Sequence, residues 1–315
     1  MTAVFGVCDP SPLAPGDAYV ATPFVSRDMR KRIDPAAVLA GVRSVIVVAV
    51  GDAGKKFNHD KHENHTKEHE KNPAISCLTH AELSSLGTNA DYHPIVRAHL
   101  TDLAEQLEKS HSAFNHKILV DSGTLDERAF AVRAGIGFIG RHGLVISPAF
   151  GTRFNIGLLL TTLPMDFART VIPAPQTEAA RSSPYPASAK NSAAHPGCAV
   201  GCYRCIQSCP TGALQENQPL NFARCLSYLT QKKELTAEEE ILLAKGNQLY
   251  GCDICQNVCP HNAPWEKILI NPQAWLHKTD ADFKNEYGHT AMLWQGAELL
   301  RRNAKNICDF HNRKG

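Results

Sequence analysis

The sequence contains no apolar run long enough to cross a membrane. Its longest run, Val42 to Val50, includes Arg43, whereas a membrane-spanning helix needs about 20 consecutive apolar residues. The N-terminal residues also lack the basic segment and following apolar run of a secretory signal. We therefore expect a cytoplasmic protein with no membrane partner.

A strong charge of either sign is also missing. The net charge is +2 over 315 residues, of which 43% are hydrophobic and 20% charged. This composition is typical of a globular protein. It does not favour a surface that binds polyanions as a whole, although a local basic patch could hold nucleic acid. The length is sufficient for two domains, each with its own core.

Cysteine, in contrast, is abundant and unevenly distributed. Three of the eleven cysteines are scattered (Cys8, Cys77 and Cys308), and the other eight lie between Cys198 and Cys259. In a reducing compartment such a group suits metal or redox chemistry better than disulfides. Thiolates are soft ligands for zinc, copper(I) or iron-sulfur clusters, so the spacing has to distinguish these.

The cysteine spacing follows the pattern of bacterial ferredoxins. Residues 202–209 and 252–259 each contain a Cys-x-x-Cys pair and a third cysteine four positions later, and a proline follows each run directly. In ferredoxins the cysteine before the proline binds the other of two clusters. The pattern predicts two 4Fe-4S clusters. A zinc site, which usually uses two separated Cys-x-x-Cys pairs, and purely structural cysteines are the alternatives.

Two irregularities determine the expected ligands. Cys198 lies one position earlier than the usual first ligand, and we expect a backbone adjustment near Gly197 and Gly201 to let it bind. The second run has no leading cysteine, and Cys225 is the natural supplier. The expected ligands are Cys198, Cys202, Cys205 and Cys259 for one cluster, and Cys209, Cys225, Cys252 and Cys255 for the other.

The remaining segments predict four regions along the chain. Residues 1–172 combine strand-like runs with an amphipathic helix at His93–Ser110, which indicates an α+β domain. Residues 173–196 are rich in proline, alanine and serine and predict a linker. Residues 197–268 form the expected cluster domain, and residues 269–315 a short C-terminal segment with one helical piece. The strand-like runs are Ser44–Val50, His116–Ser122 and Asn155–Leu163.

Two other patterns have ordinary explanations. The histidine-rich segment, residues 57–72, lacks hydrophobic anchors and is expected to be a solvated insert rather than a metal site. Gly135, Gly137 and Gly140 resemble a fragment of a nucleotide-binding fingerprint. However, they follow a helical stretch instead of a strand, so we expect tight packing around a turn or a ligand rather than a dinucleotide site.

Five motifs along the chain are distinctive: ADYHPIVRAHL, VDSGTLDERAFAVRAGIGFIGRHGLVISPAFG, CYRCIQSCPTGAL, RCLSYLTQKKEL and GNQLYGCDICQNVCPHN. Together they resemble the epoxyqueuosine reductase family. The likeness extends from about residue 30 to residue 305, except for the linker and the histidine-rich segment. It implies a nitroreductase-like, cobalamin-binding domain followed by a ferredoxin-like domain. It also implies reduction of epoxyqueuosine to queuosine in a tRNA anticodon loop, the last step of queuosine biosynthesis, by low-valent cobalamin that two 4Fe-4S clusters supply with electrons.

The resemblance also implies roles for single residues. Asp121 matches the proton-donating aspartate of the family, and its position after an apolar run suits a carboxyl group held partly desolvated. His93 is a candidate pocket residue, whereas Glu127 and Arg128 are expected to form a structural pair. The implied cofactor-binding residues are Arg32, Asp121, Val145, Ile156, Ser227 and Asp253.

The expected partners are tRNA and an external electron donor such as a flavodoxin or ferredoxin system, and we expect a monomer. Lys232 and Lys233 are candidate phosphate contacts. The chain departs from the family pattern at Ser84, where some members have a cysteine, and the sequence ends before the helical repeats of many members. The alternatives are a related cobalamin reductase with a small-molecule substrate and an iron-sulfur electron carrier without catalytic cobalt.

Overall fold

The computed structural model describes residues 2–14, 24–51, 80–111, 113–172 and 197–313 and divides into two compact units. The division does not follow chain order, because described residues 80–92 group with the C-terminal part although the sequence predicts them in the first domain. Unit 1 contains the described residues of Met1–Ala53, His93–Tyr203 and Pro260–Ala263, and unit 2 those of Gly54–Tyr92, Arg204–Cys259 and Pro264–Gly315.

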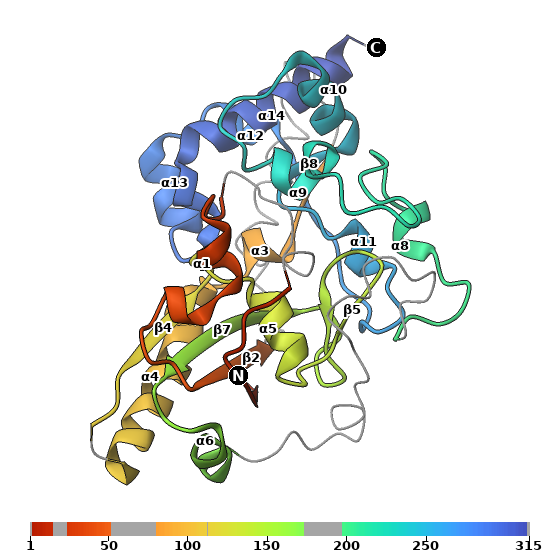
Figure 1. The fold of residues 1–315 in the computed structure, drawn as a ribbon. Coiled ribbons are helices and arrows are strands. Elements are labelled where there is room, and N and C mark those ends of the chain that lie inside the picture. The colour runs from red at the N-terminus through yellow and green to blue at the C-terminus, as the bar shows by residue number, and fades with distance from the viewer. Residues whose placement is uncertain (1, 15–23, 52–79, 112, 173–196, 314–315) are drawn as a thin grey trace. The chain divides into compact units, whose positions relative to one another are not determined.

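Unit 1 is built on an antiparallel sheet with the strand order β1-β2-β7-β4 (Figure 1). The central strand β2 is buried along its whole length, which explains its continuous apolar sequence. The three predicted strand runs are confirmed, with ends that differ by no more than two residues. The strands are β1 (Ala3–Cys8), β2 (Ser44–Gly51), β4 (His116–Val120) and β7 (Phe154–Thr161).

Helices cover both faces of this sheet. On one face, α4 (Tyr92–Ser110), the predicted amphipathic helix, approaches β7 so closely that a Cβ on Gly157 would lie 2.5 Å from Cγ1 of Val96. On the other face, Phe130 of α5 (Glu127–Arg133) packs in the core that includes alternate residues of β2 and β7. Unit 1 also contains α1 (Met29–Ile33), η1 (Pro35–Ala37) and α6 (Met165–Val171).

The glycine-rich segment after α5 leads into a small hairpin of β5 (Phe138–Ile139) and β6 (Val145–Ile146). A Cβ on Gly137 would lie 2.0 Å from the carbonyl oxygen of Ile146, and one on Gly140 would lie 2.6 Å from its Cδ1. The glycines therefore permit close packing, as the sequence predicts.

Unit 2 has a three-stranded sheet in which β3 (Ala81–Leu83) lies between β8 (Gln248–Tyr250) and β9 (Ile268–Ile270). Strand β3 is parallel to β8 and antiparallel to β9. The core of the unit centres on three aromatic rings, Trp275, Phe283 and Tyr287, with edge-on contacts at 5.3 and 5.5 Å. Four shorter helices carry or adjoin cysteines: α8 (Arg204–Gln207), η4 (Phe222–Arg224), α9 (Leu226–Leu229) and α11 (Ile254–Asn257). Another short helix, α3 (Ser85–Thr88), follows β3.

Longer helices complete unit 2. Helix α10 (Ala237–Gly246) begins with a capping box in which Thr236 and Glu239 each accept a backbone hydrogen bond, and it ends at Asn247 in a left-handed conformation. Residues 269–315 contain α12 (Gln273–Leu276), α13 (Asp280–Tyr287), η5 (Ala291–Gln295) and α14 (Ala297–Asn312), so this segment has more helices than the single piece predicted.

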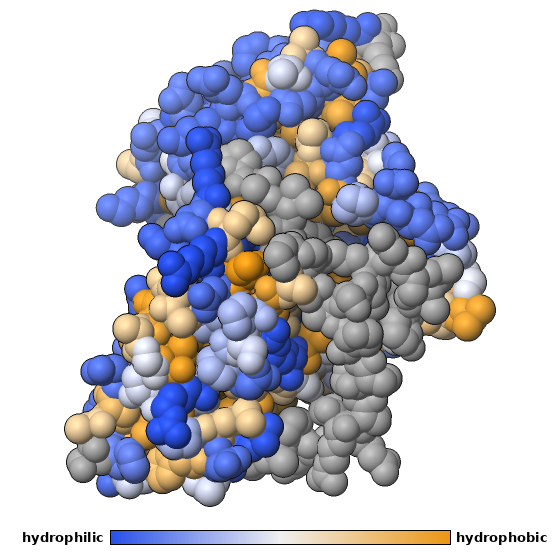
Figure 2. Space-filling view, viewed as in Figure 1, coloured by the Kyte–Doolittle hydropathy of each residue, from blue (hydrophilic) through white to orange (hydrophobic). Residues whose placement is uncertain are grey.

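Helix α14 is amphipathic and buries one side in the core of unit 2. Asn303 lies on that buried side and donates hydrogen bonds to the carbonyl oxygens of Thr230 (2.8 Å) and Leu249 (2.9 Å). The visible face over α13 and α14 is mainly hydrophilic (Figure 2).

No helix in the described segments has the length and apolar character needed to span a membrane. The predictions for the histidine-rich segment, residues 57–72, and for the linker, residues 173–196, lie outside the described residues.

Candidate cluster and catalytic sites

Cysteines from both runs, together with Cys225, lie in unit 2. Cys205 lies in α8, Cys225 caps the N-terminus of α9, and Cys255 lies in α11. Short helices thus place each thiol at or near a turn. Unit 2 also contains Cys209, Cys252 and Cys259. The ten cysteines in the described segments are all free.

Burial controls the acidity of these thiols. It raises the pKa of Cys252 to about 12, and the nearby thiols of Cys225 and Cys209 contribute to the rise. Burial also raises the pKa of Cys255 well above its usual value, together with the thiols of Cys252, Cys225 and Cys205. These five thiols are therefore neighbours. A positively charged partner, such as cluster iron, would compensate their ionisation.

Cys209 differs from the other thiols of unit 2. Burial opposes its ionisation, but backbone N–H groups of Leu214, Thr211 and Ala213 stabilise the thiolate, so that its pKa lies below the usual value. Hydrogen bonds of this kind to cysteine sulfur are one means by which proteins adjust iron-sulfur clusters.

The first part of the first cysteine run belongs to unit 1. Cys198 and Cys202 flank Gly201, which has a left-handed backbone with φ 74°, and the Cys202 N–H donates to the carbonyl oxygen of Ala199 at 3.0 Å. Gly201, one of the two glycines near which a backbone adjustment is expected, thus has an unusual backbone conformation. Among the described residues, no three His, Cys, Asp or Glu side chains converge on a point that would suit a single metal ion. The four thiolates of a cubane each bind a different iron, so a cubane does not require such convergence.

Asp121 follows β4 in a tight turn of unit 1. Its backbone has φ 43°, an uncommon conformation for a residue other than glycine. Its side chain is 63% exposed, so the partial desolvation expected from the sequence is not observed. Nε2 of His93, at the start of α4, lies 3.9 Å from Oδ2 of Asp121, which places these two predicted residues side by side.

The backbone around Asp121 is held from outside the turn. Gly123 has φ 65°, and a Cβ at this position would lie 2.6 Å from the carbonyl oxygen of Phe24. The N–H of Ser26 donates to the carbonyl oxygen of Gly123 at 2.8 Å. The exposed carboxyl group of Asp121 is therefore carried by a closely packed backbone.

Arg32, a predicted cofactor contact, is almost completely buried. Its Nη2 lies 3.2 Å from Oδ2 of Asp126, and the two side chains are 5% and 2% exposed. Asp126 also caps α5 by accepting a hydrogen bond from the N–H of Ala129. The guanidinium of Arg32 thus neutralises a buried helix cap, a structural role that the sequence did not predict.

The other predicted cofactor residues of unit 1 lie in or near its core. Val145 is 3% exposed, belongs to the core, and pairs with Ile139 in the β5–β6 hairpin. Ile156 is partly buried and packs against the same core from β7.

Ser227 and Asp253, the predicted cofactor residues of unit 2, also have local partners. The carbonyl oxygen of Ser227 accepts a hydrogen bond from Nε2 of Gln231 at 2.9 Å. Asp253 is 8% exposed, and its Oδ2 accepts a hydrogen bond from the N–H of Ser85 at 2.7 Å. The Asp253 carboxylate thereby connects the second cysteine run to the start of α3.

Glu127 and Arg128, which are expected to form a structural pair, have other partners in the structure. Nη1 of Arg128 donates to the carbonyl oxygen of Gly143 at 3.2 Å, and its Nε lies 4.0 Å from Oδ1 of Asp126. The groups that affect the Glu127 carboxyl most are instead Asp121 and the backbone of the preceding turn.

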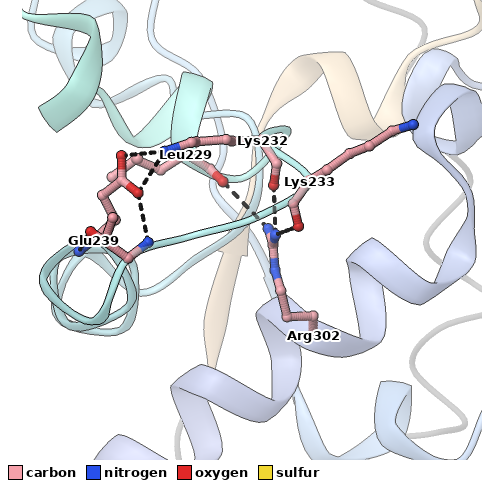
Figure 3. A network of polar contacts seen from close by, with 6 residues as sticks. Leu229, Lys232, Lys233, Glu239 and Arg302 are labelled. Carbon is pink, nitrogen blue, oxygen red and sulfur yellow. Dashed lines mark hydrogen bonds and ion pairs between the residues drawn. The ribbon is translucent and has the colours of Figure 1, made fainter.

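Lys232 and Lys233, the candidate phosphate contacts, have different surroundings (Figure 3). Nζ of Lys232 lies 2.7 Å from both carboxylate oxygens of Glu239, whereas the Lys233 side chain is exposed and extends away from this network. Arg302 of α14 fixes the loop by donating to the carbonyl oxygen of Lys233 at 2.6 Å. Of these two lysines, Lys233 is therefore the one with an exposed charge.

Family models match both parts of the chain. Residues 198–262 match the 4Fe-4S double cluster binding domain, and residues 32–122 match the model described as Epoxyqueuosine reductase QueG, DUF1730. Among curated relatives, the epoxyqueuosine reductase of Staphylococcus aureus is 31% identical over 295 residues, which cover 90% of this chain and 68% of the relative. The chain belongs to the epoxyqueuosine reductase family. The Lactococcus garvieae member is 30% identical, with coverage of 89% and 72%.

Solved structures of the family have the same mixed helix and strand fold. The epoxyqueuosine reductase of Streptococcus thermophilus has a TM-score of 0.70 and 27% identity, covering 99% of this chain and 78% of its own. An epoxyqueuosine reductase with a tRNA-Tyr epoxyqueuosine-modified stem loop has a TM-score of 0.71 and 25% identity, covering 96% and 76%. Like other family members, the chain is an oxidoreductase that contains a 4Fe-4S double cluster domain.

Sequence reasoning missed one polar connection that follows the second cysteine run. Asn262, three residues after Cys259, accepts a hydrogen bond from the N–H of Thr152 at 2.7 Å and donates to the Thr152 Oγ1 at 2.8 Å. Gly151, with φ 61°, leaves room for this contact, since a Cβ there would lie 2.2 Å from Oδ1 of Asn262. The only signal in the sequence is an asparagine that follows the Cys-Pro pair.

Proposed function

We propose that this chain reduces epoxyqueuosine to queuosine in the anticodon loop of a tRNA, with cobalamin supplied with electrons by two 4Fe-4S clusters. The observation that carries the proposal is the combination of a double cluster domain with an exposed carboxyl group, Asp121, at the end of β4 in a chain of this family. A solved relative carries a stem loop of epoxyqueuosine-modified tRNA-Tyr, which supports the same class of substrate.

The donor set supports the assignment of the clusters. Burial raises the pKa values of the Cys252 and Cys255 thiols, so their thiolate forms need a positive charge nearby. Cluster iron supplies that charge and favours the thiolate form. The ligands would be Cys198, Cys202, Cys205 and Cys259 for one cluster, and Cys209, Cys225, Cys252 and Cys255 for the other. Such clusters pass electrons one at a time. The two-electron reduction therefore needs a further cofactor that delivers two electrons to the substrate.

Cobalamin would supply that group, a low-valent cobalt able to attack or reduce the epoxide. The residues present fit it in part. Asp121 is exposed and Ile156 is only partly buried, whereas the side chain of Arg32 is committed to Asp126 and that of Val145 to the core. We therefore propose Asp121, Ile156 and the backbone of Val145 as contacts in unit 1, within a nitroreductase-like domain, and Ser227 and Asp253 as contacts in unit 2.

Asp121 would supply protons. Loss of the epoxide oxygen as water takes up two electrons, which come from the clusters, and two protons, which reach the leaving oxygen through a general acid. The exposed carboxyl group of Asp121 can be reprotonated from solvent, and His93, at 3.9 Å, can hold its orientation. A flavodoxin or ferredoxin system is the proposed electron donor. The tRNA substrate implies a cytoplasmic location, and we propose a monomer.

The experiment is mass spectrometry of tRNA nucleosides after incubation of epoxyqueuosine-containing tRNA with the reconstituted protein, cobalamin and a reductant. Queuosine should appear only when all components are present. A paralogue with a small-molecule substrate would bind cobalamin without forming queuosine, and an electron carrier would show no corrinoid absorption.

Asp121→Asn tests the proposed proton donor. It should leave the iron content and corrinoid absorption unchanged and lower turnover by about 100-fold or more. Asp102→Asn is the matched control, because Asp102 is an exposed carboxyl group on α4, and it should retain wild-type turnover. Full turnover by Asp121→Asn would remove Asp121 from the mechanism without affecting the assignment of the clusters.

A further inference from the structure

Glu127 is a half-buried residue whose carboxyl group the proposed chemistry does not use. It is the first residue of α5, six positions after Asp121. Its Oε1 is buried and has no hydrogen-bond partner in the described part of the chain. Leaving a charged carboxylate in such a place is costly unless it is compensated, so the position of Glu127 calls for an explanation.

The turn that carries Asp121 packs against this carboxyl group. The backbone N–H groups of Ser122 and Asp121 interact with it, and the Asp121 carboxylate is the charge that affects it most. The same turn has the left-handed backbone at Asp121. Glu127 thus contacts the backbone of the turn that carries the proposed proton donor, Asp121.

The charges around Glu127 do not neutralise it. Asp126 adds a second negative charge, and the guanidinium of Arg32, which interacts with Glu127, is already paired with Asp126 at 3.2 Å. The charged groups that surround Glu127 and its partners are Asp121 and Asp126 from its own loop, Arg128 from α5, Arg32 from α1 and His93 from α4.

The balance of these effects favours the neutral carboxyl group. Burial and the Asp121 carboxylate raise the pKa of Glu127 from 4.5 to about 8, although the N–H groups of Ser122 and Asp121 oppose the rise. At neutral pH the Glu127 side chain is therefore mostly protonated, next to a turn that must present a carboxyl group to the substrate.

We propose that Glu127 is a positioning residue for Asp121: its uncharged carboxyl group supports the Asp121–Ser122 turn, and its ionisation displaces the Asp121 carboxylate by repulsion. This inference rests on the proposed role of Asp121. A loop with an uncommon backbone conformation depends on its surroundings to retain it, so a new charge behind the turn shifts the exposed side chain rather than the closely packed Gly123.

The pH profile of turnover tests this role. In the wild type, kcat should fall about tenfold per pH unit above about pH 8, as Glu127 ionises. Glu127→Gln keeps the shape and hydrogen-bonding capacity of the neutral side chain, so kcat at pH 7 should stay within about threefold of wild type and the alkaline fall should disappear. The KM for tRNA should not change. Glu105→Gln makes the same chemical change at an exposed position of α4 and should retain the wild-type profile.

A second measurement does not depend on turnover. The side-chain carboxyl carbon of Asp121, assigned in labelled protein with the help of Asp121→Asn, should show by ¹³C NMR an inflection near pH 8 in the wild type. This inflection should be absent from Glu127→Gln. If the inflection is present and no queuosine forms, the proposed function fails while the coupling of the two carboxyl groups stands. If the wild type lacks it, or if Glu127→Gln keeps the alkaline fall, the inference about Glu127 is wrong.

Discussion

The cysteines of unit 2 and the Asp121 turn of unit 1 present reactive groups in opposite ways. The thiols of Cys252 and Cys255 are buried among other thiols, and burial raises their pKa values. The Asp121 carboxyl group is 63% exposed, while the buried group of that region, Glu127, lies behind it. As a cluster ligand, such a thiol would depend on bound metal to compensate its charge, whereas the Asp121 turn, in our proposal, depends on a neighbour that stays neutral.

The largest expected effect breaks the cluster side of this comparison. Cys255→Ala removes the thiol whose neighbours are three other thiols, and it should halve the iron content and lower turnover by more than about 100-fold, because the electron path is interrupted. Iron analysis and electron paramagnetic resonance of the reduced protein measure the loss.

The control for this change is Cys308→Ala. Cys308 is also buried, but it lies in α14 and belongs to no cysteine run. This variant should lose some stability and keep its full iron content. Equal iron loss in both variants would mean that the iron content reports folding rather than ligation.

The next effect is a pH dependence of stability that arises from Glu127, next to the Asp121 turn. Because the pKa of Glu127 is higher in the folded chain (about 8) than its ordinary value (4.5), the folded chain binds a proton between these pH values that the unfolded chain releases. The free energy of unfolding therefore decreases as the pH rises from about 4.5 to about 8, and remains low above that range.

Glu127→Gln lacks this titration. Relative to wild type, it should gain stability through the same pH window, by up to a few kcal/mol. Anaerobic thermal unfolding at several pH values measures the difference, and Glu105→Gln, at an exposed position, should follow the wild type. A constant difference at all pH values would contradict the assignment of a neutral Glu127.

The two regions also differ in how far the sequence predicts them. The ferredoxin spacing predicts the cluster ligands because ligand chemistry imposes a local pattern, and the apolar runs predict β2 and β7 because both lie buried in the sheet. The partners of Arg32, Asp253 and Lys232 were not predictable in this way. Each depends on a side chain brought near by folding, such as Asp126, which lies 94 positions from Arg32.

The burial of Glu127 illustrates the same limit. In the sequence it resembles any acidic residue in the first turn of a helix, where a negative charge is usually favourable. Burial of its carboxyl group and the nearby Asp121 carboxylate, which folding brings about, make it a group that stays neutral. Asp121 is likewise exposed, with an uncommon backbone conformation, although it follows an apolar run.

A smaller effect tests whether polar contacts within unit 2 stabilise the region that carries the cysteines. Asn303→Ala leaves the carbonyl oxygens of Thr230 and Leu249 without their donor, so unit 2 should lose about 2 kcal/mol of stability. Because Thr230 ends α9, which Cys225 caps, iron should also leave the variant faster in the presence of a chelator. Asn312→Ala, at the exposed end of α14, should change neither the stability nor the rate of iron loss.

The smallest effect separates the two lysines of the loop after α9. Lys233→Ala removes an exposed charge and should weaken tRNA binding by less than about 1 kcal/mol, with a decrease of about 1 in the slope of log affinity against log salt. Lys232→Ala should leave this slope nearly unchanged and instead lower the stability of α10, because the ammonium of Lys232 is paired with Glu239 of the capping box. Filter binding at several salt concentrations measures both variants. Equal slopes for Lys233→Ala and wild type would exclude Lys233 from the tRNA interface, whereas a lowered slope for Lys232→Ala would show that its pair with Glu239 opens when tRNA binds.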